Sequence, residues 1–167
     1  MSKKFTIEKG DTNEILREVS TPVALNELHK YKPLAENMLK HIRNPKNGGV
    51  GLAAPQVGVN KRIIVVSLMK DYDDENYRTI AMINPVIVAH SETTCSDQEG
   101  CLSLPGDSGD VVRWMEVDIE FYNIEGRKFA LHLDQLAARI VQHEIDHLNG
   151  VLFTDKLIKE EKKEKSD

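Results

Sequence analysis

Hydrophobic residues follow helical spacing in one part of the chain and strand-like patterns in others. Between residues 24 and 43 apolar side chains recur at roughly helical spacing, which predicts an amphipathic helix. Pro33 interrupts this pattern, and we expect it to open the main helix at its first turn rather than to kink a longer one. Residues 62–68 form a short continuous apolar run, as in a buried strand. Residues 79–91 read as extended, with Pro85 marking a bulge or an edge position.

Two segments without a clear period connect these elements. Residues 48–58, GGVGLAAPQVG, suit neither a helix nor a strand, and their glycines permit positive φ angles and close approach by another backbone. Residues 69–78 are charged. Both segments are therefore expected to be loops. Nearer the N-terminus, residues 11–23 predict a short helical turn with Asp11 or Thr12 as its N-cap.

A hairpin and a second helix follow. Residues 116–124 alternate apolar and polar side chains, and a Glu-Gly turn leads into residues 127–133, so these two strands should pair antiparallel. The next segment begins at Asp134, a good N-cap, and ends at Asn149-Gly150, a good helix stop. Together the segments predict an α+β fold. Mostly antiparallel β-sheets would pack around this central helix, with an N-terminal helix and a C-terminal helical extension.

Composition and charge limit the kind of protein this is. A chain of 167 residues that is 40% hydrophobic and 29% charged is typical of a globular domain, which we expect over residues 1–157. Residues 158–167 read as a charged, flexible tail. The net charge of −5 leaves no basic surplus, so no sequence-specific nucleic acid is expected as a partner. Because the chain lacks a membrane-length apolar run and a signal-peptide core, we expect a cytoplasmic protein without a membrane partner.

The central helix carries the pattern H-E-x-x-H within the sequence QHEIDHLNG. His143 and His147 are four residues apart, so on a helix they share one face and can bind one metal ion. Glu144 is rotated by roughly 100° from His143 and can flank the metal without binding it. A general base acting on a metal-activated water would stand there. Both histidines extend an apolar stripe through Leu136 and Ile140, which argues against a solvated helix face.

A catalytic metal site usually takes three protein ligands, and the helix supplies only two. The longer protease pattern H-E-x-x-H-x-x-G-x-x-H fails because Phe153 occupies its last position. The glutamates further downstream lie in the charged tail. Cys101, in the segment EGCLSLPG, offers a thiolate, which is a strong ligand for zinc or ferrous iron. Cys95 and Cys101 make no disulfide framework, and Cys101 is therefore the favoured third ligand.

Three segments resemble, in order and spacing, the signature motifs of the peptide deformylases. They are GVGLAAPQVG at 49–58, EGCLSLPG at 99–106 and QHEIDHLNG at 142–150. Weaker likeness extends from about Glu14 to Leu157. Members of this family remove the formyl group from the N-terminal methionine of new bacterial and organellar chains. The resemblance implies a metal-dependent hydrolase whose partners are nascent N-formylmethionyl polypeptides.

The same resemblance assigns the catalytic roles. It implies one divalent metal ion, with Fe²⁺ favoured and Zn²⁺, Ni²⁺ or Co²⁺ possible in a purified preparation, held by Cys101, His143 and His147. Glu144 would act as general base on the metal-activated water and then as general acid toward the leaving amine. Attack on the formyl carbon puts negative charge on its oxygen, which needs fixed donors. Matching positions assign these donors to the side-chain amide of Gln56 and the backbone N–H of Leu102.

Substrate contacts are expected from all three motifs. The backbone around Gly49 and Gly51 can bind an extended peptide much as an added strand would. Glu99 and Gly100 are further candidates for contact with the substrate. An apolar slot for the methionine side chain is expected from Val50, Leu136 and Ile140.

Other charged residues are candidates for an indirect role. Glu99 and Arg113 are expected to form a salt bridge that orients the cysteine segment, and Asp146 to act similarly on a neighbouring ligand. The charged tail is a candidate for contact with the ribosome.

Two alternatives share the helix motif. One is a metallopeptidase that cuts internal peptide bonds. The other is a non-catalytic metal-containing homologue, for which Cys95 is the available fourth ligand.

Overall fold

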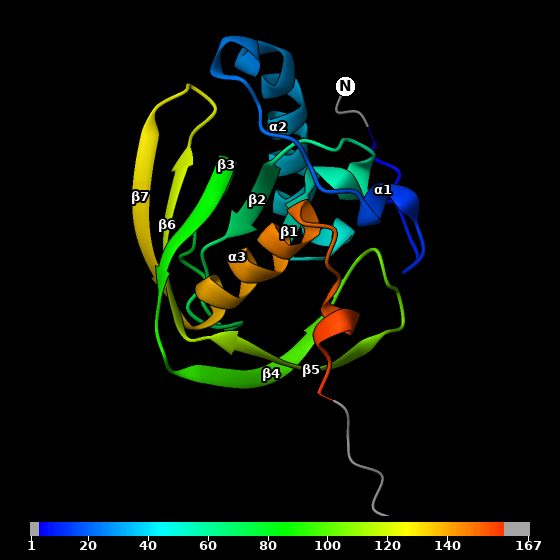
Figure 1. Cartoon of the computed structure of the whole chain (residues 1–167), viewed down its shortest axis with the longest axis vertical. Helices are drawn as coiled ribbons and strands as arrows, with labels where there is room; N and C mark the ends of the chain where they lie inside the picture. The colour runs from blue at the N-terminus through cyan, green and yellow to red at the C-terminus, as the bar shows by residue number, and fades with distance from the viewer. Residues whose placement is uncertain (1–3, 159–167) are drawn as a thin grey trace, which may run out of the picture.

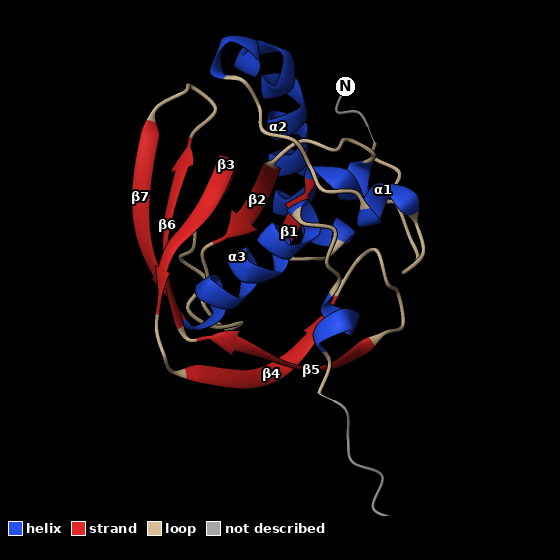
Figure 2. Ribbon diagram, viewed as in Figure 1, coloured by secondary structure: helices blue, strands red, loops and turns tan. Residues whose placement is uncertain are grey.

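All named strand pairs of the molecule are antiparallel. The computed structural model describes residues 4–158. Its larger sheet has the order β1-β2-β3-β6-β7, formed by β1 (Gly51–Ala53), β2 (Ile63–Ser67), β3 (Thr79–His90), β6 (Glu116–Tyr122) and β7 (Lys128–Asp134). A separate two-stranded sheet lies at one end of the molecule and pairs β4 (Thr94–Gly100) with β5 (Ser108–Trp114) (Figure 2). The helices are α1 (Glu14–Arg17), α2 (Leu28–Arg43) and α3 (Gln135–Leu148), with 3-10 turns at η1 (Leu25–Glu27), η2 (Pro45–Asn47), η3 (Ala54–Val57) and η4 (Phe153–Lys156).

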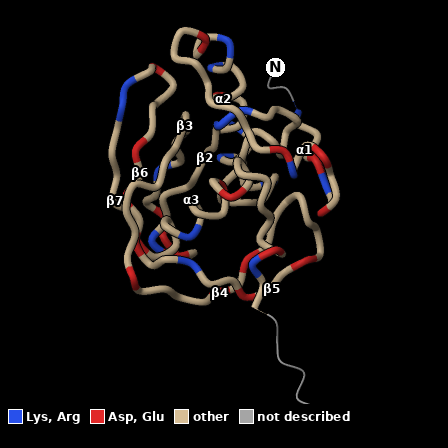
Figure 3. Tube along the Cα trace, in the orientation of Figure 1, with Lys and Arg blue, Asp and Glu red and all other residues tan. Residues whose placement is uncertain are grey.

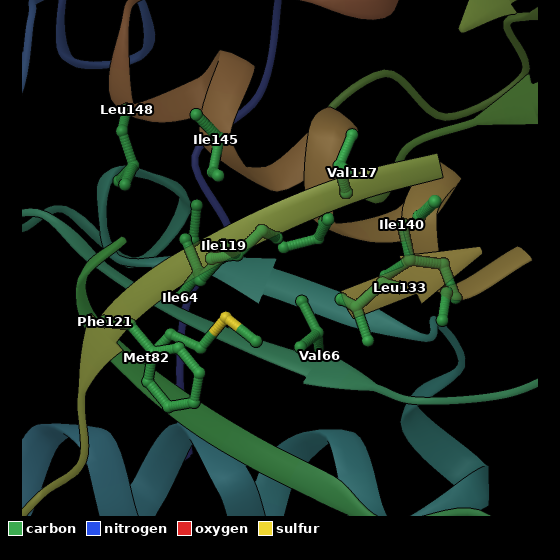
Figure 4. Packing of buried hydrophobic residues seen from close by; sticks show 14 residues of the cluster. Ile64, Val66, Met82, Val117, Ile119, Phe121, Leu133, Ile140, Ile145 and Leu148 are labelled. Atoms are coloured by element: carbon green, nitrogen blue, oxygen red, sulfur yellow. The ribbon is translucent and has the colours of Figure 1, made fainter. Parts of the chain in front are cut away.

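The helix α3 lies between the two sheets (Figure 1). Its apolar residues, among them Ile140, Ile145 and Leu148, pack onto Met82 and Ile119 of the larger sheet (Figure 4). Full burial of one such side chain contributes about 1.5–3 kcal/mol. The α+β fold predicted from the sequence, with a central H-E-x-x-H helix, is confirmed. The helix is buried on most sides, which explains why its histidines continue an apolar stripe.

The helix α2 covers the opposite face of the larger sheet, where Leu39 and Ile42 pack against Ile63 and Ile83. The prediction that Pro33 opens this helix was wrong, because α2 begins at Leu28 and Pro33 lies inside it. Pro33 has no N–H, so one backbone carbonyl loses its helical partner. Pro33 is exposed, and water can satisfy that carbonyl while the apolar face keeps the helix in place.

The paired strands β6 and β7 form the predicted hairpin, with Val117 opposite Leu133. A register shift between Ile83 and Val86 places Pro85 at a bulge of β3, as expected. The segment 48–58 is not only a loop, because it contains β1 and η3.

The sequence did not predict the two strands β4 and β5. At the N-terminus, the cap of α1 is Asn13 rather than Asp11 or Thr12, since its side chain accepts from the N–H groups of Ile15 and Leu16.

The C-terminal segment is described only as far as Ile158. Its N–H donates to the backbone oxygen of Asp110 at the edge of β5 (2.9 Å). The predicted helical extension and nearly all of the predicted tail over 158–167 lie outside the described residues. Lys and Arg are interspersed with Asp and Glu over the described chain (Figure 3). None of the helices in residues 4–158 combines the length and apolar character needed to cross a membrane.

Candidate metal centre and active site

Three potential metal ligands meet where α3 passes the end of β4. Cys101 directly follows β4, and its Sγ lies 3.4 Å from Nε2 of His147. One ligand atom from each of Cys101, His143 and His147 lies within 4.8 Å of the others. A thiolate with two imidazoles suits zinc, ferrous iron and similar divalent transition metals.

A carboxylate fixes the orientation of His143. Nδ1 of His143 lies 2.8 Å from Oε1 of Glu99, and because a carboxylate only accepts, Nδ1 is the donor. The other ring nitrogen, Nε2, is then left as an acceptor that could bind a metal ion. This contact would hold both the ring plane and the tautomer that metal binding requires.

Glu99 is itself held by two buried arginines. Arg113 donates from Nε and Nη2 to its two oxygens (2.9 Å each), and Arg139 donates to Oε2 (2.6 Å). Burial alone would raise the pKa of Glu99, but hydrogen bonds from Arg113 and His143 lower it far below the ordinary value. Glu99 is therefore a carboxylate at neutral pH. The expected Glu99–Arg113 salt bridge is present, and Arg113 also pairs with Asp146 (2.5 Å).

Glu144 is buried beside the ligand group and lacks a partner on one oxygen. Its side chain is 4% exposed, and Oε2 makes no hydrogen bond to residues 4–158. A Cβ added at Gly51 would come within 2.9 Å of Oε1 of Glu144, so only glycine leaves room for this carboxyl group. Burial raises the pKa of Glu144 to about 7, against the attraction of His143. A group with this pKa can both take up and release a proton near neutral pH.

The two histidines differ in their affinity for protons. Burial and repulsion by His143 lower the pKa of His147 well below the ordinary value. Burial also disfavours a charged His143, but hydrogen bonds with Cys101 and Glu99 prevail and raise the pKa of His143 to about 10. The site therefore stabilises positive charge between Cys101 and Glu99. A divalent cation held by the three ligands would supply that charge in place of the proton.

Gln56 lies next to Cys101 in a fixed orientation. Its Oε1 accepts from the N–H of Ala53 (2.9 Å), and its Nε2 donates to Oγ of Ser103 (3.1 Å). The same Nε2 lies 3.5 Å from Sγ of Cys101. The backbone N–H of Leu102 has no acceptor within residues 4–158. Both expected oxyanion donors therefore lie beside the ligand group.

A cavity of about 410 Å³ opens onto these residues. All of the predicted site residues line it except His147, which is fully buried. The lining residues are Gly49, Val50, Gly51, Gln56, Tyr72, Glu99, Gly100, Cys101, Leu102, Leu136, Arg139, Ile140, His143 and Glu144. Two of them, Tyr72 and Arg139, were not predicted. Tyr72 belongs to a charged loop without a periodic pattern, whereas Arg139 could have been found from its position four residues before His143.

The fold and the ligand group define an α+β protein with a Cys-His-His site capable of binding a metal. A family model described as polypeptide deformylase matches residues 6–163. The peptide deformylase of Desulfitobacterium hafniense is 43% identical over 144 residues, which cover 86% of this chain and 89% of that relative. The chain belongs to the polypeptide deformylase family.

Two further comparisons agree. A crystal structure of the Met-Ala-Ser-bound class I type b peptide deformylase from Acinetobacter baumannii has a TM-score of 0.85 and 34% identity, covering 94% of this chain and 100% of that one. The peptide deformylase of Prochlorococcus marinus (strain NATL1A) is 42% identical over 134 residues, or 80% of this chain. The matched part spans 64% of the length of that relative.

Proposed function

We propose that this chain is a metal-dependent deformylase that hydrolyses the N-formyl group of formyl-methionine at the start of new polypeptides. The observation that carries this proposal is the group formed by Cys101, His143 and His147 within 4.8 Å, beside a buried carboxyl group in an open cavity. The orphaned oxygen of Glu144 and the thiolate–imidazole donor set both fit a divalent metal at this place.

Different residues of the chain then carry out the proton transfer and stabilise the negative charge. A metal held by the three ligands would polarise a water molecule and lower its pKa. Glu144 takes a proton from that water and passes it to the leaving amine, which its pKa of about 7 suits. The amide of Gln56 and the N–H of Leu102 donate to the oxygen that becomes negative as the formyl carbon is attacked.

The cavity wall accounts for substrate recognition. Gly49 and Gly51 present the backbone of the glycine-rich segment to an extended peptide. Val50, Leu136 and Ile140 form the apolar slot for the methionine side chain, and Gly100 borders it. Met-Ala-Ser, which occupies the relative from Acinetobacter baumannii, begins with the residue that this slot is expected to hold. Glu99 also borders the cavity, although its oxygens already bind Arg113, Arg139 and His143.

We also propose a metal, a partner and a location for this chain. Fe²⁺ is the first metal to test, followed by Zn²⁺, Ni²⁺ and Co²⁺, because a mixed thiolate and imidazole site accepts all four. The partners would be nascent formylated chains in the cytoplasm. A contact of the tail with the ribosome concerns residues outside the described range.

The test compares two substrates with one preparation purified and assayed without oxygen. Formyl-Met-Ala-Ser and an unformylated internal peptide are incubated with the metal-loaded chain, and formate release and backbone cleavage are measured. Rapid formate release without backbone cleavage is expected. Cleavage of the internal peptide without formate release would instead identify a metallopeptidase.

A non-catalytic metal site is disfavoured by the position of Cys95. A closed structural site needs a fourth protein ligand, and Cys95 was the available residue. Its Sγ contacts Nη2 of Arg139 (3.5 Å) and is not part of the ligand group formed within residues 4–158. A metal held by these three ligands would therefore keep one position for water.

A further inference from the structure

Arg139 is a buried cation that the proposed chemistry does not use. Its side chain is on α3, one helical turn before His143, and the residue is 5% exposed. Nη1 donates to Oε2 of Glu99 (2.6 Å) and to the backbone oxygen of Val111 (2.9 Å). Nη2 donates to the backbone oxygen of Cys95 (2.9 Å). All of these acceptors belong to β4 or β5, so one side chain of the helix binds both strands of the hairpin.

The carboxylate of Glu99 therefore accepts hydrogen bonds from two residues on the same face of α3. His143 donates to Oε1 and Arg139 to Oε2, and residues four apart on a helix lie on one side. Arg113 also binds both oxygens, but it lies on β5 and reaches α3 at Asp146, on the far side of His143 from Arg139 in the sequence. Without Arg139, the only bond between the Glu99 carboxylate and α3 would be the one to His143.

Other contacts between α3 and the hairpin act further from the cysteine. Gln142 exchanges hydrogen bonds with the backbone N–H and C=O of Trp114, which pairs with Thr94 at the start of β4. Arg139 also reaches the other end of β4, because it binds Glu99, which precedes Cys101 by two residues. The spacing between the cysteine and the two histidines is therefore most directly controlled by Arg139.

We infer that Arg139 is a positioning residue of the metal centre. It holds the cysteine-bearing end of the β4–β5 hairpin, and the carboxylate that orients His143, at a fixed place relative to α3. The inference rests on the proposed metal site but not on the reaction carried out there. Residues that orient metal ligands typically contribute 10–100-fold to metal affinity.

The experiment titrates the metal-free full chain with Co²⁺ under anaerobic conditions and records its absorption spectrum. Cobalt reports the geometry of its site through its ligand-field bands and the bond to sulfur through a charge-transfer band. Arg139→Met should bind Co²⁺ about 10–100-fold more weakly and with altered bands. The cobalt affinity of Arg139→Lys should lie between that of the parent and that of Arg139→Met. A single ammonium group can pair with Glu99 but cannot also bind both backbone carbonyls.

Arg43→Met serves as the control. Arg43 is on α2, and its Nη2 donates to the backbone oxygen of Thr79 (3.0 Å), away from the ligand group. This variant removes an exposed arginine that also binds a carbonyl, so it should lower the thermal midpoint slightly while leaving cobalt affinity and spectrum unchanged. Circular dichroism of each metal-free variant establishes that it is folded.

Parent-like cobalt affinity and spectrum in folded Arg139→Met would overturn the inference. If that variant does not fold, Arg139→Lys decides, and parent-like affinity and bands there would overturn the inference equally. Formate release is measured separately. A parent that binds cobalt with the expected response to Arg139 but releases no formate would refute the proposed reaction and leave the positioning role standing. A parent that binds no cobalt would refute both.

Discussion

The two sheets on either side of α3 are joined to it by different kinds of contact. The larger sheet meets the helix through apolar side chains such as Met82 and Ile119, which are completely buried. The β4–β5 pair meets it through polar groups, with Arg113 bound to Asp146 and Gln142 bound to the backbone of Trp114. Glu99 and Arg113, which a hydrophobic pattern would leave on the surface, are among the buried residues of this hairpin.

Apolar and polar contacts with α3 have different physical consequences. Apolar contacts are non-directional and grow with buried area, so they stabilise the fold while tolerating small shifts. Hydrogen-bonded ion pairs fix distances and angles, but desolvation offsets most of their net contribution to stability. Cys101 comes from the polar side, and its position relative to the histidines has to be fixed. We conclude that the larger sheet supplies stability and the hairpin supplies geometry.

Glu144→Gln should have the largest effect. It keeps the size of the side chain and removes its ability to carry a proton, so formate release should fall by about 10²–10⁴-fold. Neither sheet is disturbed, and the metal content should stay at the parent level. The assay pairs turnover of formyl-Met-Ala-Ser with metal analysis, and Glu120→Gln on the exposed side of β6 is the matched control. Turnover close to that of the parent would remove Glu144 from the reaction.

Arg113→Ala tests the polar side. It removes one partner from the buried carboxylate of Glu99, which keeps Arg139 and His143, and one from Asp146, which keeps Lys156. The lost charged hydrogen bonds should cost about 1.5–3 kcal/mol in the free energy of unfolding. It should also weaken metal binding by about 10–100-fold, because Glu99 orients His143. Urea unfolding and metal titration measure the two effects. Unchanged metal affinity and activity would show that Arg113 has no role at the site.

Ile119→Ala tests the apolar side. Ile119 is fully buried in the core shared by the larger sheet and α3, so its truncation should cost about 2–5 kcal/mol in the free energy of unfolding. The fraction that remains folded should bind metal with parent affinity. Val88→Ala, on an exposed position of β3, should change stability by no more than about 0.5 kcal/mol. A lowered metal affinity in folded Ile119→Ala would contradict the division of roles, because it would show that the larger sheet also controls the geometry of the ligand group.

The stability of the metal-free chain should depend on pH through Glu144. Its pKa is about 7 when folded, against 4.5 for an unperturbed glutamate, so between these values the folded state binds more protons than the unfolded state. The contribution of Glu144 is therefore most favourable below pH 4.5 and is lost as the pH rises to about 7, by on the order of 3 kcal/mol. Urea unfolding with a chelator at several pH values measures it. The dependence attributed to Glu144 should be absent in Glu144→Gln.

Tyr72→Ala should have the smallest effect. Tyr72 lines the cavity from the loop between β2 and β3 without touching the ligand group. Loss of its contact with the peptide should raise KM for formyl-Met-Ala-Ser several-fold, since one apolar contact contributes about 1 kcal/mol, and leave kcat nearly unchanged. Tyr77→Ala is the control, because Tyr77 lies in the same loop but outside this cavity. Equal KM values for the two variants would exclude a contact with Tyr72.

The apolar half of this architecture could be predicted from the sequence, whereas the polar half largely could not. Residues 62–68 and 116–124 follow patterns that burial imposes, and both became strands of the larger sheet. The segment TCSDQEG of β4 has no such alternation, because most of its residues are exposed and its one buried side chain is Glu99. That carboxylate binds Arg139, which lies 40 residues further along the chain.

The motifs directed attention to the ligands but not to the groups that support them. His143 and His147 were recognisable from their spacing, and Cys101 from the absence of a third ligand on the helix. Arg139 was missed because an arginine in an amphipathic helix usually faces solvent. Its spacing of four residues from His143 was the available signal, and the fold places Glu99 in front of it. Tyr72 contributes through a loop whose path no local pattern encodes.

The most direct test of the account is the metal content of two cysteine variants. Cys95 lies on β4 and Cys101 directly follows that strand, but within residues 4–158 only Cys101 belongs to the ligand group. After anaerobic purification and loading with Fe²⁺ or Co²⁺, the parent and Cys95→Ala should each hold one metal per chain, and Cys101→Ala should hold far less. Parent-level metal content and affinity in Cys101→Ala would contradict a site built from the hairpin and the helix together.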